Sequence, residues 1–307
     1  MLTLDRISKS FGERAALTDV SFDVTRGRLT GFVGGNGAGK TTAMRIILNV
    51  LRADAGSVTL DGRPITGADL RGFGYMPEER GLYPKMALAE QLAYLARLHG
   101  IDKASAFRRA DDLLERLGLA ERRKDALESL SLGNQQRVQV AAALVHTPDV
   151  LVLDEPFSGL DPLAVDEVVS VIAEHAARGI PVLFSSHQLD VVERLCDDLV
   201  VIAGGRIRVA GSRDGLREEF AGNRWSLEAF GDAGWVRDVP EVTVLELAGD
   251  AVEFSGSEAA AQNILARAVA AGGVRSFGRV RPTLGEIFRD IVVDDPDHSD
   301  SNESEAA

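Results

Sequence analysis

The chain has 307 residues, 45% of them hydrophobic and 26% charged, which is the composition of a globular protein with room for two folded units. Its formal net charge of −13 argues against a nucleic-acid partner, because non-specific binding to phosphates needs a basic surface. The single cysteine, Cys196, excludes an intramolecular disulfide and fits a reducing compartment.

The apolar segments of the chain are short. The N-terminal residues alternate like a strand and lack the apolar core of a signal peptide. The longest apolar runs, such as Val138–Val145, fall far short of the ~20 residues that a membrane-spanning helix needs. We therefore expect a cytoplasmic protein that reaches the inner face of the cell membrane only through a partner.

The N-terminal part alternates between strand and helix patterns. Strands are predicted at Leu2–Ile7, Val20–Val24, Leu29–Val33 and Val58–Leu60. Between the last two, apolar residues from Met44 to Leu51 follow the spacing of one buried helix face. From Leu88 to Gly118 two helical stripes follow each other without a strand signal, which predicts a helical subdomain, about residues 82–147, inserted into a sheet domain.

Strands and helices then alternate again, which is typical of a mostly parallel sheet covered by helices. The predicted elements are the strands Val150–Leu153 and Pro181–Ser185, helices around Val165–Ile172 and Gln188–Leu195, and a hairpin of Leu199–Ala203 with Arg206–Ala210. From about Gly222 the pattern starts anew with a strand, a hairpin, a helix over 258–271, a strand and a last helix from Thr283. This segment predicts a small α+β unit.

A glycine-rich loop lies between the third strand and the helix that follows it. Its sequence matches GxxxxGK(S/T), in which glycines let backbone N–H groups cradle a phosphate chain at a helix N-terminus. Lys40 supplies a mobile charge for the β- and γ-phosphates and Thr41 an oxygen for Mg²⁺. A plain glycine turn is the alternative, which the strand before and the helix after disfavour. The residues predicted to bind the nucleotide here are Gly34, Asn36, Gly37, Ala38, Gly39, Lys40, Thr41 and Thr42.

An acidic pair follows the buried strand Val150–Leu153. Asp154 is predicted to hold Mg²⁺, because a carboxylate at the end of a buried strand is costly unless it faces a cation. Glu155 is then placed to act as general base for the attacking water. The alternative is an acidic cap for the next helix, which the upstream phosphate loop makes less plausible.

The segment between these two motifs carries a family resemblance. Leu130–Arg137 reads LSLGNQQR before an amphipathic helix, and it resembles the LSGGQ signature of the ATP-binding cassette (ABC) ATPases. The Ser131 hydroxyl and the Gly133 amide lie at a helix N-terminus that can be aimed at a phosphate. Further elements of this family follow in order. Phe11 stands where the family has an aromatic that stacks on adenine, Asp161 ends a segment like the D-loop, and His187 resembles the switch histidine.

Three departures from the family pattern are visible. Phe11 replaces the more usual tyrosine, and Leu132 and Asn134 replace Gly and Gln of the signature. Glu78 stands in the place of the glutamine-loop residue, and we expect it to contact Mg²⁺ or its water, with a solvated loop acid as the alternative. The PEERGLYPKM stretch resembles a bacterial subgroup of exporter ATPases of the sodium-efflux type, which also carry a small C-terminal domain.

The resemblance implies an α/β P-loop cassette with a mostly parallel sheet, an antiparallel β subdomain and the inserted helices. We expect the cassette at residues 1–220, the small α+β domain at 221–292 and an acidic disordered tail at 293–307. The implied activity is ATP hydrolysis with Mg²⁺, in a pair of cassettes where Ser131 and Gly133 of one subunit close the ATP site of the other. The pair would drive a multi-span membrane permease. Rival interpretations are a soluble ABC ATPase acting on ribosomes or DNA, which the single cassette disfavours, and a regulator that does not hydrolyse ATP, which Glu155 disfavours.

Overall fold

A six-stranded mixed sheet forms the frame of the larger unit in the computed structural model, which describes residues 1–79 and 81–293. The strand order is β10-β9-β3-β8-β7-β6, and every neighbouring pair is parallel except β10 with β9. The bounds are β3 (Leu29–Val33), β6 (Phe73–Met76), β7 (Val150–Leu153), β8 (Val182–Ser186), β9 (Asp198–Ala203) and β10 (Arg206–Ser212). All residues of β3, β7 and β8 are buried, as expected for strands covered on both faces.

A second, antiparallel sheet of order β2-β1-β4-β5 packs against the first. Its strands are β1 (Leu2–Phe11), β2 (Arg14–Val24), β4 (Ala55–Leu60) and β5 (Arg63–Pro64), with the short helix α2 (Gly67–Leu70) after them. One hydrophobic core joins both sheets and the helix α1 (Lys40–Ile47), with Phe22, Phe32 and Met44 among its buried members. The parallel sheet and the antiparallel β subdomain that the sequence predicts are both confirmed.

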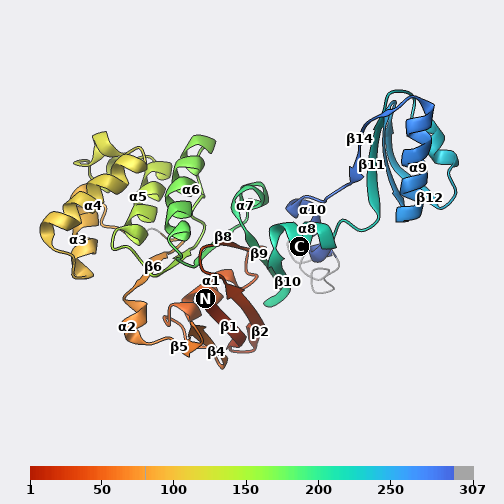
Figure 1. Ribbon diagram of the computed structural model, residues 1–307. Helices are drawn as coiled ribbons and strands as arrows, with labels where there is room; N and C mark the ends of the chain where they lie inside the picture. The colour runs from red at the N-terminus through yellow and green to blue at the C-terminus, as the bar shows by residue number, and fades with distance from the viewer. Residues whose placement is uncertain (80, 294–307) are drawn as a thin grey trace, which may run out of the picture. The chain divides into compact units, whose positions relative to one another are not determined.

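The predicted helical insertion is present between β6 and β7. It contains α3 (Leu88–Leu98), α4 (Lys103–Arg116), α5 (Leu132–Leu144) and two short 3₁₀ helices, η1 (Ala120–Arg122) and η2 (Leu127–Ser129). Side-chain caps fix where two of the helices begin: Asp102 accepts from the Ser105 N–H at 3.0 Å, and Ser131 accepts from the Asn134 N–H at 3.4 Å. In Figure 1 α3, α4, α5 and α6 (Pro162–Ala177) gather on one side of this unit, away from the antiparallel sheet. Helix α7 (Leu189–Leu195) follows β8.

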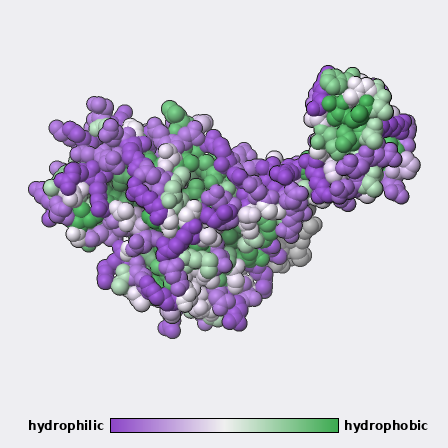
Figure 2. Space-filling view, viewed as in Figure 1, coloured by the Kyte–Doolittle hydropathy of each residue, from purple (hydrophilic) through white to green (hydrophobic). Residues whose placement is uncertain are grey.

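The smaller unit is an antiparallel sheet of order β12-β13-β11-β14 with a helix against it. The elements are β11 (Arg224–Ala229), η3 (Gly234–Asp238), β12 (Val242–Ala248), β13 (Ala251–Gly256), α9 (Glu258–Ala271) and β14 (Val274–Arg279). Its own core includes Trp225, Phe254 and Ile264, and Figure 2 shows a patch of hydrophobic residues on the surface of this unit. The α+β class predicted for this segment is confirmed.

The division between the units differs from the predicted one. Unit 1 comprises Met1–Ser212 with the residues that follow Asp290 up to residue 293, and unit 2 is Arg213–Asp290. The predicted boundary at residue 220 lies just after helix α8 (Arg213–Glu219), whereas the structure divides the chain just before this helix. This helix lies in unit 2, where the Arg217 guanidinium donates to the Pro282 carbonyl at 3.0 Å; helix α10 (Leu284–Val293) begins in the same unit. The predicted tail at 293–307 begins with the last residue of α10. The rest of it, residues 294–307, lies outside the described residues.

The short elements β5, α2, η1, η2 and η3 were not predicted, and neither were β6 and α8. The strand β6 is only four residues long and contains Gly74, so its sequence shows no alternation, and its conformation depends on pairing with β7. The helix α8 is short and mostly charged. In the part of the chain that the structure describes, no helix is both long and apolar enough to cross a membrane.

The two separate cores predict independent unfolding. We expect the fragment Met1–Ser212 to fold cooperatively, because its core draws on no residue of unit 2. In the full chain, Phe254→Ala should destabilise unit 2 by about 3–5 kcal/mol and leave the unfolding of unit 1 unchanged. Calorimetry of the three proteins measures this. A lower melting temperature for unit 1 in the Phe254→Ala protein would show that the cores are coupled.

Candidate active site

The carboxyl ends of four parallel strands meet at one edge of the large sheet, and the predicted site residues follow these ends. The glycine loop follows β3, Asp154 and Glu155 follow β7, and His187 follows β8. The Asp154 N–H donates to the Met76 carbonyl at 2.8 Å, so the end of β6 and the residues after it are held beside the acidic pair. This edge is where open α/β sheets bind ligands.

The glycine loop has a backbone that only glycine accepts at two positions. Gly39 has φ +111, and a Cβ there would lie 2.6 Å from the Leu17 side chain. A Cβ on Gly34 would lie 2.4 Å from the Ile202 carbonyl oxygen. The loop is therefore shaped by contacts with β2 and β9 as well as by its own turns.

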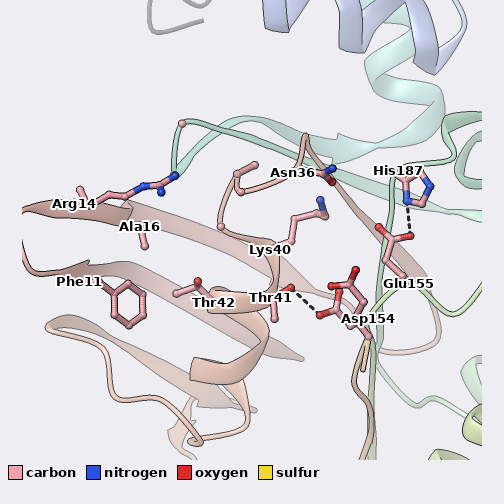
Figure 3. Close-up of a pocket in the computed structure, with 17 residues that line it drawn as sticks. Phe11, Arg14, Ala16, Asn36, Lys40, Thr41, Thr42, Asp154, Glu155 and His187 are labelled. Atoms are coloured by element: carbon pink, nitrogen blue, oxygen red, sulfur yellow. Dashed lines mark hydrogen bonds and ion pairs between the residues drawn. The ribbon is translucent and has the colours of Figure 1, made fainter. Parts of the chain in front are cut away.

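Lys40, the first residue of α1, is 9% exposed. Its ammonium donates to the carbonyls of Gly34 at 2.7 Å and Gly35 at 3.1 Å. The cation thus lies inside the loop, and its hydrogen-bond partners among the described residues are neutral carbonyls. Figure 3 shows it extending into the cavity between the loop and the acidic pair. It is placed to move onto an anion that enters the loop.

Asp154 is a buried carboxylate with only hydroxyl partners. It is 1% exposed; its Oδ2 accepts from the Thr41 hydroxyl at 2.9 Å and its Oδ1 from the Ser185 hydroxyl at 2.5 Å. Within residues 1–79 and 81–293, no basic side chain forms an ion pair with it. Burial, followed by the negative charge of Asp154, raises the pKa of Tyr75 on the neighbouring strand β6. The arrangement is an oxygen-rich, electronegative position that a cation would satisfy.

The residues present fit Mg²⁺ bound together with phosphates. The described residues contain no cluster of three or more His, Cys, Asp or Glu side chains able to hold a metal alone. Mg²⁺ is commonly held by one or two carboxylates, water and substrate phosphates, and it needs no such cluster. Thr41 and Asp154 lie within 2.9 Å of each other and supply hard oxygen ligands.

Glu155 and His187 form a second pair of side chains in the cavity. His187 Nδ1 lies 2.9 Å from Glu155 Oε2, and the side chains are 56% and 11% exposed respectively. Glu155 has φ +52, a left-handed conformation that is uncommon for a residue with a side chain. In Figure 3 this pair lies beside Asp154 at the edge of the same cavity. A carboxylate held by an imidazole next to the metal position can accept a proton from water.

These residues line one cavity of about 1100 Å³, large enough for a nucleotide. Phe11 lies at its rim, 54% exposed, with the Lys9 ammonium 5.7 Å from the ring centroid. Glu78 lines the cavity and is exposed. The predicted site residues in the lining are Phe11, Asn36, Gly37, Ala38, Gly39, Lys40, Thr41, Thr42, Glu78, Asp154, Glu155 and His187.

Sequence reasoning missed part of the lining. Arg14, Ala15 and Ala16 of β2 and the Gly204-Gly205 turn between β9 and β10 also border the cavity. No motif marks them, since they reach the loop only through the folding of the β1–β2 hairpin and the approach of the β9–β10 turn. A Cβ on Gly37 would lie 3.8 Å from the Arg14 guanidinium, which places this cation beside the phosphate loop.

Gly34 does not line the cavity, although its carbonyl accepts from the Lys40 ammonium inside the loop, and three further predicted binding residues, Ser131, Gly133 and Asp161, also lie outside the lining. Ser131 caps α5 and Asp161 caps α6, where its Oδ1 accepts from the Ala164 N–H at 2.9 Å. A Cβ on Gly133 would lie 3.1 Å from the Gly159 carbonyl, so the start of α5 packs against the segment before Asp161. These three residues form a separate group on the helical side of the unit.

Comparison with known proteins agrees with this geometry. A family model described as ABC transporter matches residues 17–158, and one described as ATP-binding protein DrrA1-3-like, C-terminal domain, matches residues 211–292. An uncharacterized ABC transporter ATP-binding protein of Bacillus subtilis (strain 168), YhaQ, is 36% identical over 95% of this chain and 98% of its own length.

The daunorubicin resistance ATP-binding protein DrrA3 of Streptomyces coeruleorubidus is 31% identical, with 96% of each chain covered. A solved structure of an ATP-binding subunit of an ABC transporter matches with a TM-score of 0.66 and 33% identity, over 72% of this chain and 93% of that one. The chain therefore belongs to the ABC transporter ATP-binding proteins, and it is an ATPase subunit that powers membrane transport.

Proposed function

We propose that this chain hydrolyses Mg·ATP as one of two cassettes that drive an ABC exporter, with Glu155 as general base. The observation that carries the proposal is the convergence of Lys40, Asp154 and the Glu155–His187 pair on one cavity. Phosphoryl transfer to water needs a cation that neutralises the phosphates, an acidic residue that binds the metal ion, and a base that activates the water. The export direction is supported by the C-terminal domain of the DrrA1-3-like type and by the resistance function named for the relative DrrA3.

Each part of the site has a separate role. The backbone N–H groups of residues 37–41, at the N-terminus of α1, bind the phosphate oxygens, and Lys40 leaves the Gly34 and Gly35 carbonyls to neutralise the β- and γ-phosphates. Thr41 and Asp154 hold Mg²⁺, which when bound screens the charge that develops on the γ-phosphate. Phe11 offers one ring face to the adenine.

Proton transfer falls to the second pair. Glu155 accepts the proton of the attacking water, and His187 Nδ1 fixes the orientation of the carboxylate. Since Ser131, Gly133 and Asp161 lie outside the cavity, we assign them to the ATP site of a second cassette. A multi-span permease is the partner that places the pair at the inner face of the membrane.

The Glu155→Gln protein tests the base. It should retain ATP binding and lose hydrolysis by about 10²–10⁴-fold, since a general base contributes rate accelerations of this size. Because opening of the closed pair requires hydrolysis, the variant should accumulate as an ATP-bound dimer in size-exclusion chromatography with Mg·ATP. The exposed Glu90→Gln on α3 is the control and should remain active. Wild-type turnover by Glu155→Gln would refute the assignment.

The Lys40→Ala protein tests the phosphate loop. It should lose ATP hydrolysis and bind ATP more weakly, because the ammonium buried in the loop is removed. The exposed Lys103→Ala on α4 serves as the control for loss of one positive charge. Nucleotide titration by fluorescence and phosphate release measure both properties, and normal turnover in Lys40→Ala would contradict the assignment.

Glu78 is proposed as a further oxygen ligand of Mg²⁺ or of its water. Glu78→Gln should stay active, while Glu78→Ala should need more Mg²⁺ and turn over more slowly. The neighbouring acid Glu79, which does not line the cavity, provides the control Glu79→Ala. ATPase rates titrated with Mg²⁺ decide the matter. Identical curves for the wild type and Glu78→Ala would reject the role.

A further inference from the structure

The main chain of Glu155 is held on both sides by buried side chains. Its N–H donates to the Ser185 hydroxyl at 2.8 Å, and its carbonyl accepts from the Gln136 amide Nε2 at 2.8 Å. Ser185 is fully buried and Gln136 is 5% exposed, so water does not compete for these bonds.

This support has a conformational reason. Glu155 has φ +52 and precedes Pro156, a position where the proline ring further restricts the allowed backbone. A residue with a side chain stays in the left-handed region only when its surroundings hold it there. A change in this peptide would turn the carboxylate away from the cavity, because φ and ψ set the direction of the side chain. The two hydrogen bonds therefore fix the orientation of the Glu155 side chain toward the cavity.

Gln136 belongs to helix α5, whose N-terminus is exposed to solvent. Helix α5 begins at Leu132 after the cap Ser131, which is exposed, while Gln136 in its second turn is buried against Glu155. Five residues of helix separate the two by about 7.5 Å. A helix is stiff over that length, so a displacement of its N-terminus moves Gln136 with it.

We propose that Gln136 is a positioning residue that sets the Glu155 peptide and couples the exposed N-terminus of α5 to the base of the same chain. The inference rests on the proposed function, in which Glu155 is the base and the start of α5 contacts the ATP of a second cassette. Engagement of α5 there then aligns Glu155 with the water in its own site. Hydrolysis in one site thereby depends on closure of the other.

The test compares two buried glutamines of the same helix. Gln136→Met keeps the side-chain volume and removes the donor to Glu155. Gln139→Met is the matched control, because Gln139 is also 5% exposed and donates to a main-chain carbonyl, that of Glu79 at 3.3 Å. Gln136→Met should lower kcat by about 10- to 10²-fold, as a small misplacement of a catalytic group does, with KM for ATP unchanged. Gln139→Met should keep kcat within about twofold of the wild type. Equal losses in the two variants would overturn the proposal.

A second variant has a pH signature. In Gln136→Glu the shape is kept, and burial raises the pKa of the new carboxyl. Protonated, it donates to the Glu155 carbonyl; ionised, it repels that oxygen. The ratio of its kcat to that of the wild type should rise as pH falls from about 8 to about 6. A ratio that stays flat would overturn the proposal even if Gln136→Met fails to fold.

The last arm separates this inference from the proposed base. Gln136→Met combined with Glu155→Gln should still form the ATP-bound dimer, since Gln136 acts on the base and not on closure; loss of that dimer would overturn the inference. If Glu155→Gln stops hydrolysis while Gln136→Met turns over like the wild type, the role of Gln136 alone is rejected. If Glu155→Gln itself turns over normally, the base and this inference both fail.

Discussion

The buried charge of Asp154 is the constraint on which the rest of the site depends. Moving a carboxylate out of water costs several kcal/mol, and its partners here are two hydroxyls, Thr41 and Ser185. A hydrogen bond to a charged group contributes about 1.5–3 kcal/mol, so these bonds offset much of the cost and leave the negative potential in place. The same two bonds tie α1 and β8 to the end of β7. The buried Asp154 carboxylate, which costs the fold free energy, thus also brings together the oxygen atoms that a cation would bind.

The backbone conformation of Glu155 is a second constraint on the site. A left-handed residue with a side chain costs about 1–2 kcal/mol, and each main-chain hydrogen bond made by Ser185 and Gln136 contributes about 0.5–1.5 kcal/mol. The two terms are comparable, so the two bonds together offset much of the cost of the conformation. The Ser185 hydroxyl bonds to both the Asp154 carboxylate and the Glu155 N–H, so the two acidic residues belong to one hydrogen-bonded group.

Much of this site could be predicted from the sequence, because its main residues follow directly after strands. The carboxyl ends of parallel strands share one edge, so apolar runs followed by glycines, by Asp154-Glu155 or by His187 indicate a shared location before any coordinates are known. The large fold followed from the same alternation of strand and helix. The helix over 258–271 was predicted with the bounds that α9 has.

What the sequence did not show depends on contacts between distant segments. β6 has no periodicity and exists through its pairing with β7, and Arg14 reaches the phosphate loop only because the β1–β2 hairpin folds over it. Unit 2 begins with α8, whose Arg217 bonds to the carbonyl of Pro282, a residue far along the chain. In the sequence, Gln136 is one polar residue among others in an amphipathic helix. Its bond to Glu155 forms because α5 packs against the end of β7.

The arrangement of α5 gives the single chain an incomplete site. The cavity holds the glycine loop, Asp154 and Glu155, yet the capped N-terminus of α5 and the start of α6 lie outside it. A helix N-terminus favours anions, and Ser131 at this one is exposed. Two copies placed so that each α5 meets the other's phosphate loop satisfy both requirements at once. On the proposed pairing, the Gln136 bond would make the base of each copy sensitive to the nucleotide held by the other, so that a contact between one amide and one carbonyl would link two active sites.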